Sequence, residues 1–365
     1  MFINENFSDA EAKIFLKKVS SEENLPFCVT DNTKVQRFCD GGQSLPLNIG
    51  DEIVVKMPKS EETFADMKFE GIATEICSRY VHGTNISTVM VYERDDYSFV
   101  TDKLIKGKTM DMGERGNNVH YSQLSEKQKD LLAADLASFL YEMHRIPIDE
   151  KGIIPDRYNN PDKHKNIRYF DEAQVNENKL TLLGYGINLD RYPQQEEDLV
   201  CSHMDLHGRN IAIDETKDHV LQGVFDFGLC GFNKRSADFV KLYTIDRELG
   251  RKTIDAYNKI SPQKVDVRNV EGQFLAWCAG NIRKAKELLK NEKYAEDGKK
   301  IMNVAGMYLA NFKSFENKQK QAEKTSDSDK LLALSGRGRF ASSLEGGDKS
   351  KISTRGMGNF FRDGR

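Results

Sequence analysis

Two neighbouring stretches decide the fold of this 365-residue chain: Ser202-His-Met-Asp-Leu-His-Gly-Arg-Asn-Ile-Ala-Ile-Asp214 and Gly223-Val-Phe-Asp-Phe-Gly228. The first reads HxDxxxxN and runs into a short apolar strand, and the second is a strand that ends in Asp-Phe-Gly. The polar residues 215–218 between them favour a turn, so we expect the two strands to pair as a hairpin. Such a hairpin would bring Asn210 and Asp226 to one end.

The residue types in these stretches suit phosphoryl transfer. Asp205 is the candidate to orient an attacking hydroxyl and to accept its proton. Mg²⁺ prefers hard oxygen ligands and keeps several waters, so the amide of Asn210 and the carboxylate of Asp226 suffice beside nucleotide phosphates. His203 is expected to brace the loop by hydrogen bonds rather than to touch substrate, and His207 is expected to be structural. Each motif alone is common by chance. The two motifs in this order, each beside an apolar strand, rarely occur together by chance.

The pair of motifs resembles the catalytic and metal motifs of the aminoglycoside phosphotransferase family, the small-molecule branch of the protein-kinase-like fold. The resemblance runs from about residue 40 to residue 242 and includes Lys103-Leu-Ile-Lys-Gly107, which is similar to the family's hinge. It also includes Asp238, similar to the family aspartate that braces the catalytic loop from below. The resemblance implies an α+β, bilobal fold with a small β-rich N-terminal lobe and a larger, mainly helical C-terminal lobe.

The resemblance also assigns a phosphate-binding lysine. Lys56, in Val54-Val-Lys-Met-Pro58, matches the family lysine that holds the α- and β-phosphates. Its expected partner is Glu70 on the next helix. Glu75 competes for that role, although it would turn Arg79 and His82 toward the core.

Two further nucleotide contacts follow from the resemblance. Gly41 and Gly42 stand where the family has its nucleotide-loop turn, and glycines let backbone amides approach phosphates closely. An ordinary hairpin turn explains these two residues equally well. For the adenine, the resemblance points to backbone groups of Asp102 and Leu104 at the hinge.

The rest of the chain divides by its pattern. Apolar periodicity and turn residues predict three strands and two helices. The strands are 51–57, 87–92 and 97–101, and the helices are 61–81 and 125–144. The apolar face of the first helix is formed by Phe69, Ile72, Ala73, Ile76 and Tyr80. Ser125 and Gln128 form a capping box at the start of the second helix. A polar insert covers 150–195, and 260–317 is mostly helical.

Three segments result: an N-terminal nucleotide-binding lobe at 1–103, a catalytic and substrate lobe at 104–320, and a tail at 321–365. The tail is rich in glycine, serine and basic residues and cannot bury enough apolar surface to offset its ordering entropy, so we expect it to be disordered.

Composition narrows the classes of function. A formal net charge of −3 gives no global basic field, so we expect no nucleic-acid partner. No run approaches the roughly 20 apolar residues that a membrane span needs, and the first residues lack a signal-peptide core, so we expect a cytoplasmic protein. The cysteines lack CxxC spacing, which argues against zinc and for reduced, mostly buried thiols. They are Cys28, Cys39, Cys77, Cys201, Cys230 and Cys278.

The leading function is a small-molecule kinase that uses ATP (or GTP) and Mg²⁺. Only Phe227–Ala237 separate Asp226 from Asp238, and no Ala-Pro-Glu follows, so a platform for a peptide substrate is missing. The alternatives are an atypical protein kinase and a nucleotide-binding module whose tail docks a partner. Trp277 and Cys278 are expected in the core. An acidic cleft would suit a polycationic acceptor, and its candidate residues are Asp171, Glu172, Asp190, Glu196, Glu197 and Asp198.

Overall fold

The computed structural model describes residues 7–22, 25–38, 44–110, 120–147, 172–192, 195 and 197–317. Gly41, Gly42 and the tail from residue 321 lie outside the described residues. The chain divides into two compact units, Met1–Leu309 and Ala310–Arg365. The described part of the second unit, 310–317, is helical, whereas the catalytic motifs and all the labelled strands belong to the first unit.

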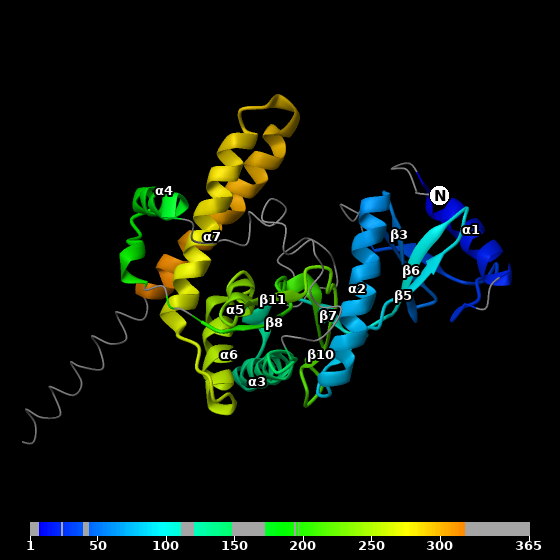
Figure 1. Ribbon diagram of the computed structural model, residues 1–365, viewed down its shortest axis with the longest axis horizontal. Coiled ribbons are helices and arrows are strands. Elements are labelled where there is room, and N and C mark those ends of the chain that lie inside the picture. Colours follow the sequence, from blue (N-terminus) through cyan, green and yellow to red (C-terminus); the bar gives the residue numbers. More distant parts are fainter. Residues whose placement is uncertain are drawn as a thin grey trace, which may run out of the picture. The chain divides into compact units, whose positions relative to one another are not determined.

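The N-terminal part of this first unit is an antiparallel five-stranded sheet in the order β1-β2-β3-β6-β5 (Figure 1). Its strands are β1 (Val35–Arg37), β2 (Ser44–Ile49), β3 (Ile53–Pro58), β5 (Met90–Glu93) and β6 (Ser98–Lys103). Helix α1 (Asp9–Glu22) packs on it through Leu16, in one apolar cluster with Leu47, Val55 and Phe99. A separate cluster joins Phe64 of helix α2 (Glu61–Tyr80) to Val100 of β6. The expected strands and helix of this region are therefore present.

Helix α2 departs from the sequence-based prediction at one position. It begins at the N-cap Ser60, whose side chain accepts a hydrogen bond from the amide of Thr63, 3.2 Å away. Ile72 was predicted to lie on the buried face but is 46% exposed. The buried face instead centres on Glu70, Ala73 and Cys77, which places position 72 on the opposite side at 3.6 residues per turn.

A second sheet carries the catalytic motifs, in the order β4-β10-β9-β7. Strands β9 (Ile211–Ile213) and β10 (Leu221–Val224) form the expected antiparallel hairpin, flanked by β4 (Asn85–Ile86) and β7 (Lys108–Thr109). Gly223 permits the close approach of β4, because a Cβ there would lie 2.7 Å from the carbonyl oxygen of Asn85. Strands β8 (Leu199–Ser202) and β11 (Gly231–Lys234) pair separately and are antiparallel.

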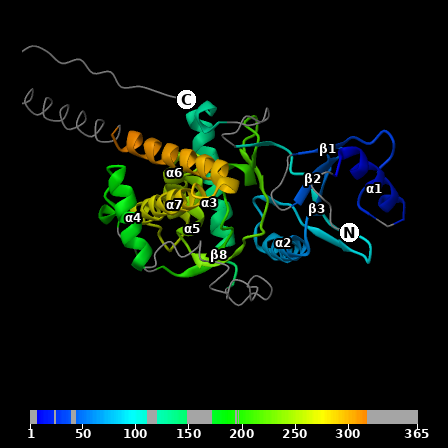
Figure 2. The same cartoon turned by 90° about the horizontal axis from the view of Figure 1, so that it is seen from above.

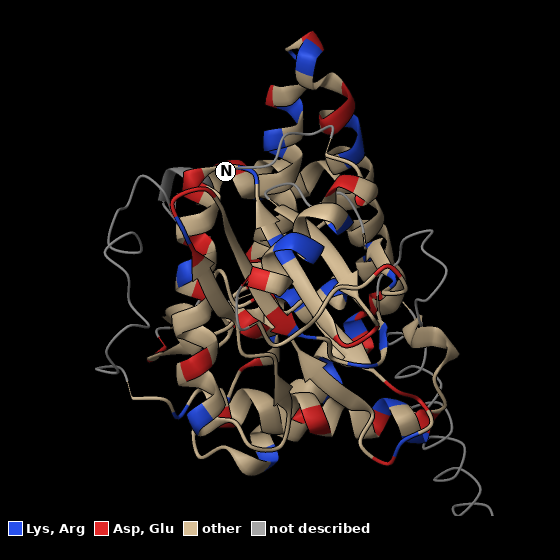
Figure 3. Cartoon of the chain, turned by 90° about the vertical axis from the view of Figure 1, so that its right-hand side faces the viewer, with Lys and Arg blue, Asp and Glu red and all other residues tan. Residues whose placement is uncertain are grey.

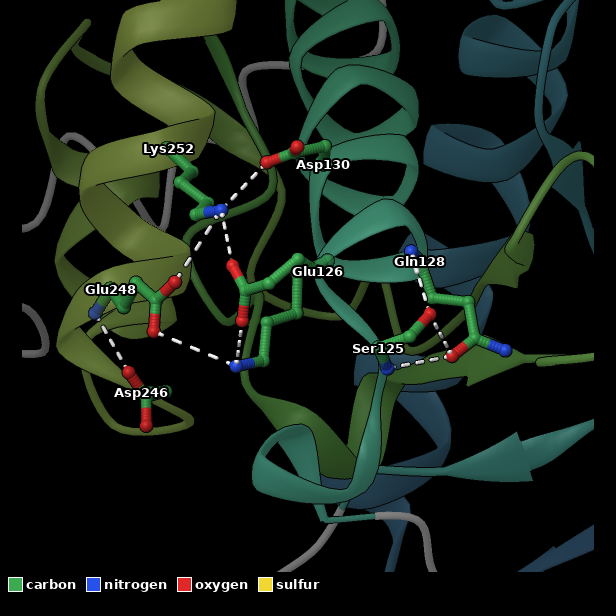
Figure 4. Close-up of polar contacts among 8 residues, drawn as sticks. Ser125, Glu126, Gln128, Asp130, Asp246, Glu248 and Lys252 are labelled. Carbon is green, nitrogen blue, oxygen red and sulfur yellow. Dashed lines mark hydrogen bonds and ion pairs between the residues drawn. The ribbon is translucent and has the colours of Figure 1, made fainter.

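Helices α3, α5, α6 and α7 pack on one another in the C-terminal part (Figure 2). The labelled helices of this part are α3 (Glu126–Met143), α4 (Glu172–Gly184), α5 (Ala237–Leu242), α6 (Arg247–Ile260) and α7 (Val267–Leu288), and residues 295–309 are helical as well. Short 3₁₀ turns lie at Tyr121–Gln123, Leu189–Arg191, Gly208–Asn210 and Glu292–Tyr294. Helix α3 begins with the predicted capping box of Ser125 and Gln128, and Lys252 of α6 reaches Asp130 of α3 at 2.6 Å (Figure 4).

Acidic and basic residues are interspersed along the described elements in the cartoon of Figure 3. No helix within the described ranges is long and apolar enough to cross a bilayer.

Candidate active site

The loop after β8 is held by a buried carboxylate. Asp238, at the start of α5, accepts hydrogen bonds from the amides of His203 (3.2 Å) and Met204 (2.8 Å). It also accepts one from Nε2 of His144, at 3.1 Å. Met204 adopts a left-handed backbone conformation (φ 68°), which a non-glycine residue keeps only when its surroundings enforce it. Asp238 thus braces the catalytic loop, as expected from the sequence.

Asp205 follows this brace and lies within a set of polar contacts. Lys241 places Nζ 3.2 Å from Oδ1 of Asp205, and His207 places Nε2 3.3 Å from Oδ2. Asn210 donates from Nδ2 to the Asp205 carbonyl at 2.9 Å. Burial alone would raise the pKa of Asp205, but the hydrogen bond from His207 and the charge of Lys241 hold it below its ordinary value. The carboxylate is therefore ionised and oriented.

Asn210 and Asp226 meet at one end of the β9–β10 hairpin. The amide of Phe225 donates to the carbonyl of Asn210 at 3.1 Å, which ties the residue before Asp226 to the catalytic loop. His203 donates from Nε2 to the Phe225 carbonyl at 3.1 Å, so it braces the loop as expected. The side-chain nitrogen of Asn210 is used inside the loop. Its amide oxygen and the Asp226 carboxylate are hard oxygen donors of the kind that fits Mg²⁺.

Lys56 is paired with two carboxylates. Its Nζ lies 2.9 and 3.0 Å from the two oxygens of Glu70. Oδ2 of Asp102 lies 3.0 Å from the same nitrogen. The competing Glu75 instead pairs with Arg79 at 2.7 Å on the exposed side of α2.

Burial and charge act against each other in this cluster. Burial alone would lower the pKa of Lys56, but Asp102 and Glu70 raise it above its usual value. Burial raises the pKa of Glu70 to about 7, against the opposing charge of Lys56. Burial likewise raises the pKa of Asp102. The charge of Asp226 acts on all three groups, so the lysine and the metal-binding motif share one electrostatic environment.

The hinge differs in detail from the expectation. Asp102 lies inside the β3–β6 ladder opposite Val54, and its side chain turns to Lys56. The amide of Leu104 already donates to the carbonyl of Glu52 at 2.8 Å. The next amide along, that of Ile105, has no acceptor among the described residues. Of the backbone groups predicted to contact the adenine, the amide of Leu104 is therefore already engaged in a hydrogen bond within the fold.

Sequence reasoning missed Lys241 and misplaced one neighbour. His207 was expected to be structural, and its Nε2 lies 3.3 Å from Oδ2 of Asp205. Trp277 was expected in the core; its ring is only half-buried and carries the ammonium of Lys241 5.1 Å from its centroid. Cys278 is buried as predicted. The available signal was the spacing of Asp238 and Lys241, which puts both on one face of a helix.

The acidic residues proposed for a polycation cleft have other partners where they are described. Asp198 pairs with Arg235, and Glu197 accepts hydrogen bonds from the amide of Ser236 and from Asn269. Asp190 pairs with Lys179 at 2.7 Å. Asp171, Glu196 and the side chain of Glu172 lie outside the described residues. These acids, where visible, therefore join elements of the C-terminal part to one another.

A lysine–glutamate pair, an HxDxxxxN loop and an Asp-Phe-Gly strand on a two-part α+β scaffold define a phosphotransferase with a protein-kinase-like fold. The chain belongs to the phosphotransferase enzyme family (APH). The model of this family matches residues 51–262. The expectation of a phosphotransferase that acts on an alcohol group is confirmed at the level of this family.

Solved structures share the fold. The GDP complex of aminoglycoside 2'-phosphotransferase-IIIa is 18% identical, with a TM-score of 0.56 over 76% of this chain and 93% of that one. The streptomycin–ATP–APH(2")-IIa complex is 24% identical, with a TM-score of 0.51 over 77% and 91%. Macrolide 2'-phosphotransferase MphH from Brachybacterium faecium is 11% identical, with a TM-score of 0.55 over 80% and 98%. The α+β, two-part architecture expected from sequence is confirmed.

Proposed function

We propose that this chain transfers the γ-phosphoryl group of ATP, in the presence of Mg²⁺, to a hydroxyl group of a small molecule. The observation that carries the proposal is the arrangement of Asp205 and Asn210, which are hydrogen-bonded to each other at the hairpin end that also holds Asp226. Lys56 completes the set, because its charge and that of Asp226 act on each other. A base, a pair of hard oxygen donors and a phosphate-binding cation are the parts that phosphoryl transfer needs.

Asp205 serves chiefly to orient the acceptor hydroxyl. Its lowered pKa makes it a weak base, so it accepts the hydroxyl proton late, when the bond to phosphorus is forming. That timing suits a loose transition state, in which positioning and charge stabilisation outweigh proton abstraction. Lys241 holds the carboxylate in place and offsets negative charge beside it.

The nucleotide is proposed to lie along β3 and the hinge. Lys56 is proposed to contact the α- and β-phosphates, whereas the contacts expected from Gly41 and Gly42 stay a prediction from the sequence because both residues lie outside the described ranges. Asn210 and Asp226 would hold Mg²⁺, which would neutralise charge on the phosphates. Since the Leu104 amide is engaged, the hinge contacts the base through backbone groups beside it, with the Ile105 amide as donor.

The fold of the segment after Asp226 supports a small acceptor. Residues Gly231–Lys234 form β11 and pair with β8, and α5 then begins at Ala237, one residue before Asp238. No long segment remains for an extended peptide to lie against among these residues. The structural neighbours are named for aminoglycosides and macrolides, and we propose an acceptor of that kind, an amino-sugar or another alcohol.

The test is phosphate transfer from labelled ATP to a panel of small-molecule alcohols and, separately, to a protein lysate. The Asp205→Ala variant should lose transfer by about 10²–10⁴-fold while binding nucleotide normally, since its side chain faces the acceptor. Asp218→Ala, on the exposed turn of the hairpin, is the control and should match the wild type. Label on one protein, with none on any small molecule, would refute the proposal.

A further inference from the structure

Three of the six cysteines meet at one point of the fold. They are Cys77 on α2, Cys201 on β8, and Cys230, which immediately precedes β11. Their Sγ atoms all lie within 4.8 Å of one another, and those of Cys201 and Cys230 are 3.8 Å apart. All three side chains are fully buried. Residues far apart in the sequence thus place three thiols around a common centre.

The spacing fits a metal centre. A cation bound to three thiolates at about 2.3 Å holds the sulfur atoms roughly 3.8–4.0 Å apart. The sulfur atoms would therefore move by less than about 1 Å from their present positions to surround such an ion. Thiolates select soft cations such as Cu⁺ and Zn²⁺ over the hard Mg²⁺ of the phosphotransfer site.

We propose that Cys77, Cys201 and Cys230 form a buried three-thiolate site for a soft d¹⁰ cation, Cu⁺ or Zn²⁺. The site is separate from the proposed phosphotransfer chemistry. No fourth histidine, cysteine or carboxylate joins the cluster among the described residues. Structural Zn²⁺ takes four ligands, whereas three soft donors satisfy Cu⁺, so the donor number favours Cu⁺.

Binding involves no oxidation or reduction. Each thiol that ligates the ion loses its proton to the solvent as the metal–sulfur bond forms.

The location links the ion to the catalytic elements. Cys201 lies two residues before His203 of the catalytic loop, and Cys230 lies four residues after Asp226. Cys77 belongs to the helix that carries Glu70. A bound ion would therefore cross-link three elements that position the phosphotransfer residues, and it should stabilise the native state.

The experiment uses the reduced full-length protein under anaerobic conditions. One arm loads it with Cu⁺ and the other with Zn²⁺, and each measures bound metal after desalting and the shift in Tm. We expect one ion per chain and a raised Tm, with Cu⁺ held more tightly. Cys77→Ala, Cys201→Ala and Cys230→Ala should each weaken binding by at least about tenfold, as loss of metal-site groups does. Cys278→Ala (buried) and Cys28→Ala (exposed) are the matched controls and should bind normally.

X-ray absorption on the loaded wild-type protein provides a measurement that does not depend on a variant folding. Three sulfur neighbours at about 2.3 Å would support the site, in whichever arm the ion is retained. Retention of neither ion, nitrogen or oxygen ligands only, or full binding by a folded Cys230→Ala variant would overturn it. Phosphate transfer by protein free of Cu⁺ and Zn²⁺ is assayed in parallel with Mg²⁺ present, so that failure of this site is distinguished from failure of the proposed activity.

Discussion

Oδ2 of Asp102 lies 3.0 Å from Nζ of Lys56, although the lysine already has Glu70 as a partner. Two buried carboxylates therefore share one cation, and the second oxygen of Asp102 has no hydrogen-bond partner among the described residues. Phosphate oxygens that approach Lys56 must compete with both carboxylates. Without nucleotide, Lys56 is therefore held by both carboxylates. Mg²⁺ and the phosphates must together offset the loss of these contacts.

Asp102→Asn should strengthen nucleotide binding. The amide keeps the shape of the side chain but removes a negative charge beside the phosphate-binding lysine. We expect the Kd for the Mg²⁺–nucleotide complex to fall by roughly tenfold, which corresponds to about 1.4 kcal/mol. Calorimetric titration measures it, with Asp95→Asn in the exposed β5–β6 turn as the control. A weaker affinity in Asp102→Asn would show that this carboxylate contacts the nucleotide itself.

Glu70 should make the fold less stable as the pH rises. Its pKa is raised to about 7 in the folded state from 4.5, so the folded chain holds a proton that the unfolded chain releases. Stability from this group is present below pH 4.5 and is lost as the pH rises through 7. Denaturant unfolding from pH 5 to 7.5 should show this decline, and the decline should be smaller in Glu70→Gln. Equal slopes in both proteins would contradict the assignment.

Asp226→Ala should impair Mg²⁺-dependent nucleotide binding more than Asn210→Ala does. A carboxylate brings a charge to the cation, whereas the amide offers a neutral oxygen. Calorimetry of the nucleotide with and without Mg²⁺ gives both affinities for each variant. The proposed roles fail if the two variants lose the same amount of Mg²⁺-dependent affinity.

Lys241→Met should change the pH profile of transfer. Without the lysine, the pKa of Asp205 rises, so the acid limb of kcat/KM should move up by about 1–3 pH units. We also expect kcat to fall while the affinity for nucleotide stays the same. Lys259→Met, at an exposed position on α6, is the control. A lower kcat with an unmoved acid limb would mean that Lys241 acts only on the packing of α5 against Trp277.

Local sequence was enough to predict the motif hairpin and the starts of α2 and α3, but it did not predict helix α1 (Asp9–Glu22). The HxDxxxxN loop, the polar turn and the Asp-Phe-Gly strand are neighbours in the chain, so their pairing follows from short-range chemistry. The capping box of Ser125 and Gln128 is equally local. The partner of Lys56 was also within reach, because the helix that carries Glu70 directly follows β3.

Contacts that depend on register or on distant packing were not predictable. Asp102 reaches Lys56 only because β6 pairs with β3 so that Val54 faces Asp102. The meeting of Lys241 with Asp205 depends on how α5 is rotated against the catalytic loop. Trp277 joins them from α7, far along the chain. The cysteine cluster likewise combines three elements that no local pattern connects.

The buried brace of Asp238 has an evolutionary consequence. The geometry of phosphoryl transfer is fixed by hydrogen bonds to the backbone of His203 and Met204, from a residue that is 0% exposed and so cannot touch the acceptor. Trp277, by contrast, is half-buried beside Lys241 and takes no part in the hydrogen bonds of that brace. Substitutions outside this brace can therefore accumulate while the backbone that carries Asp205 keeps its position.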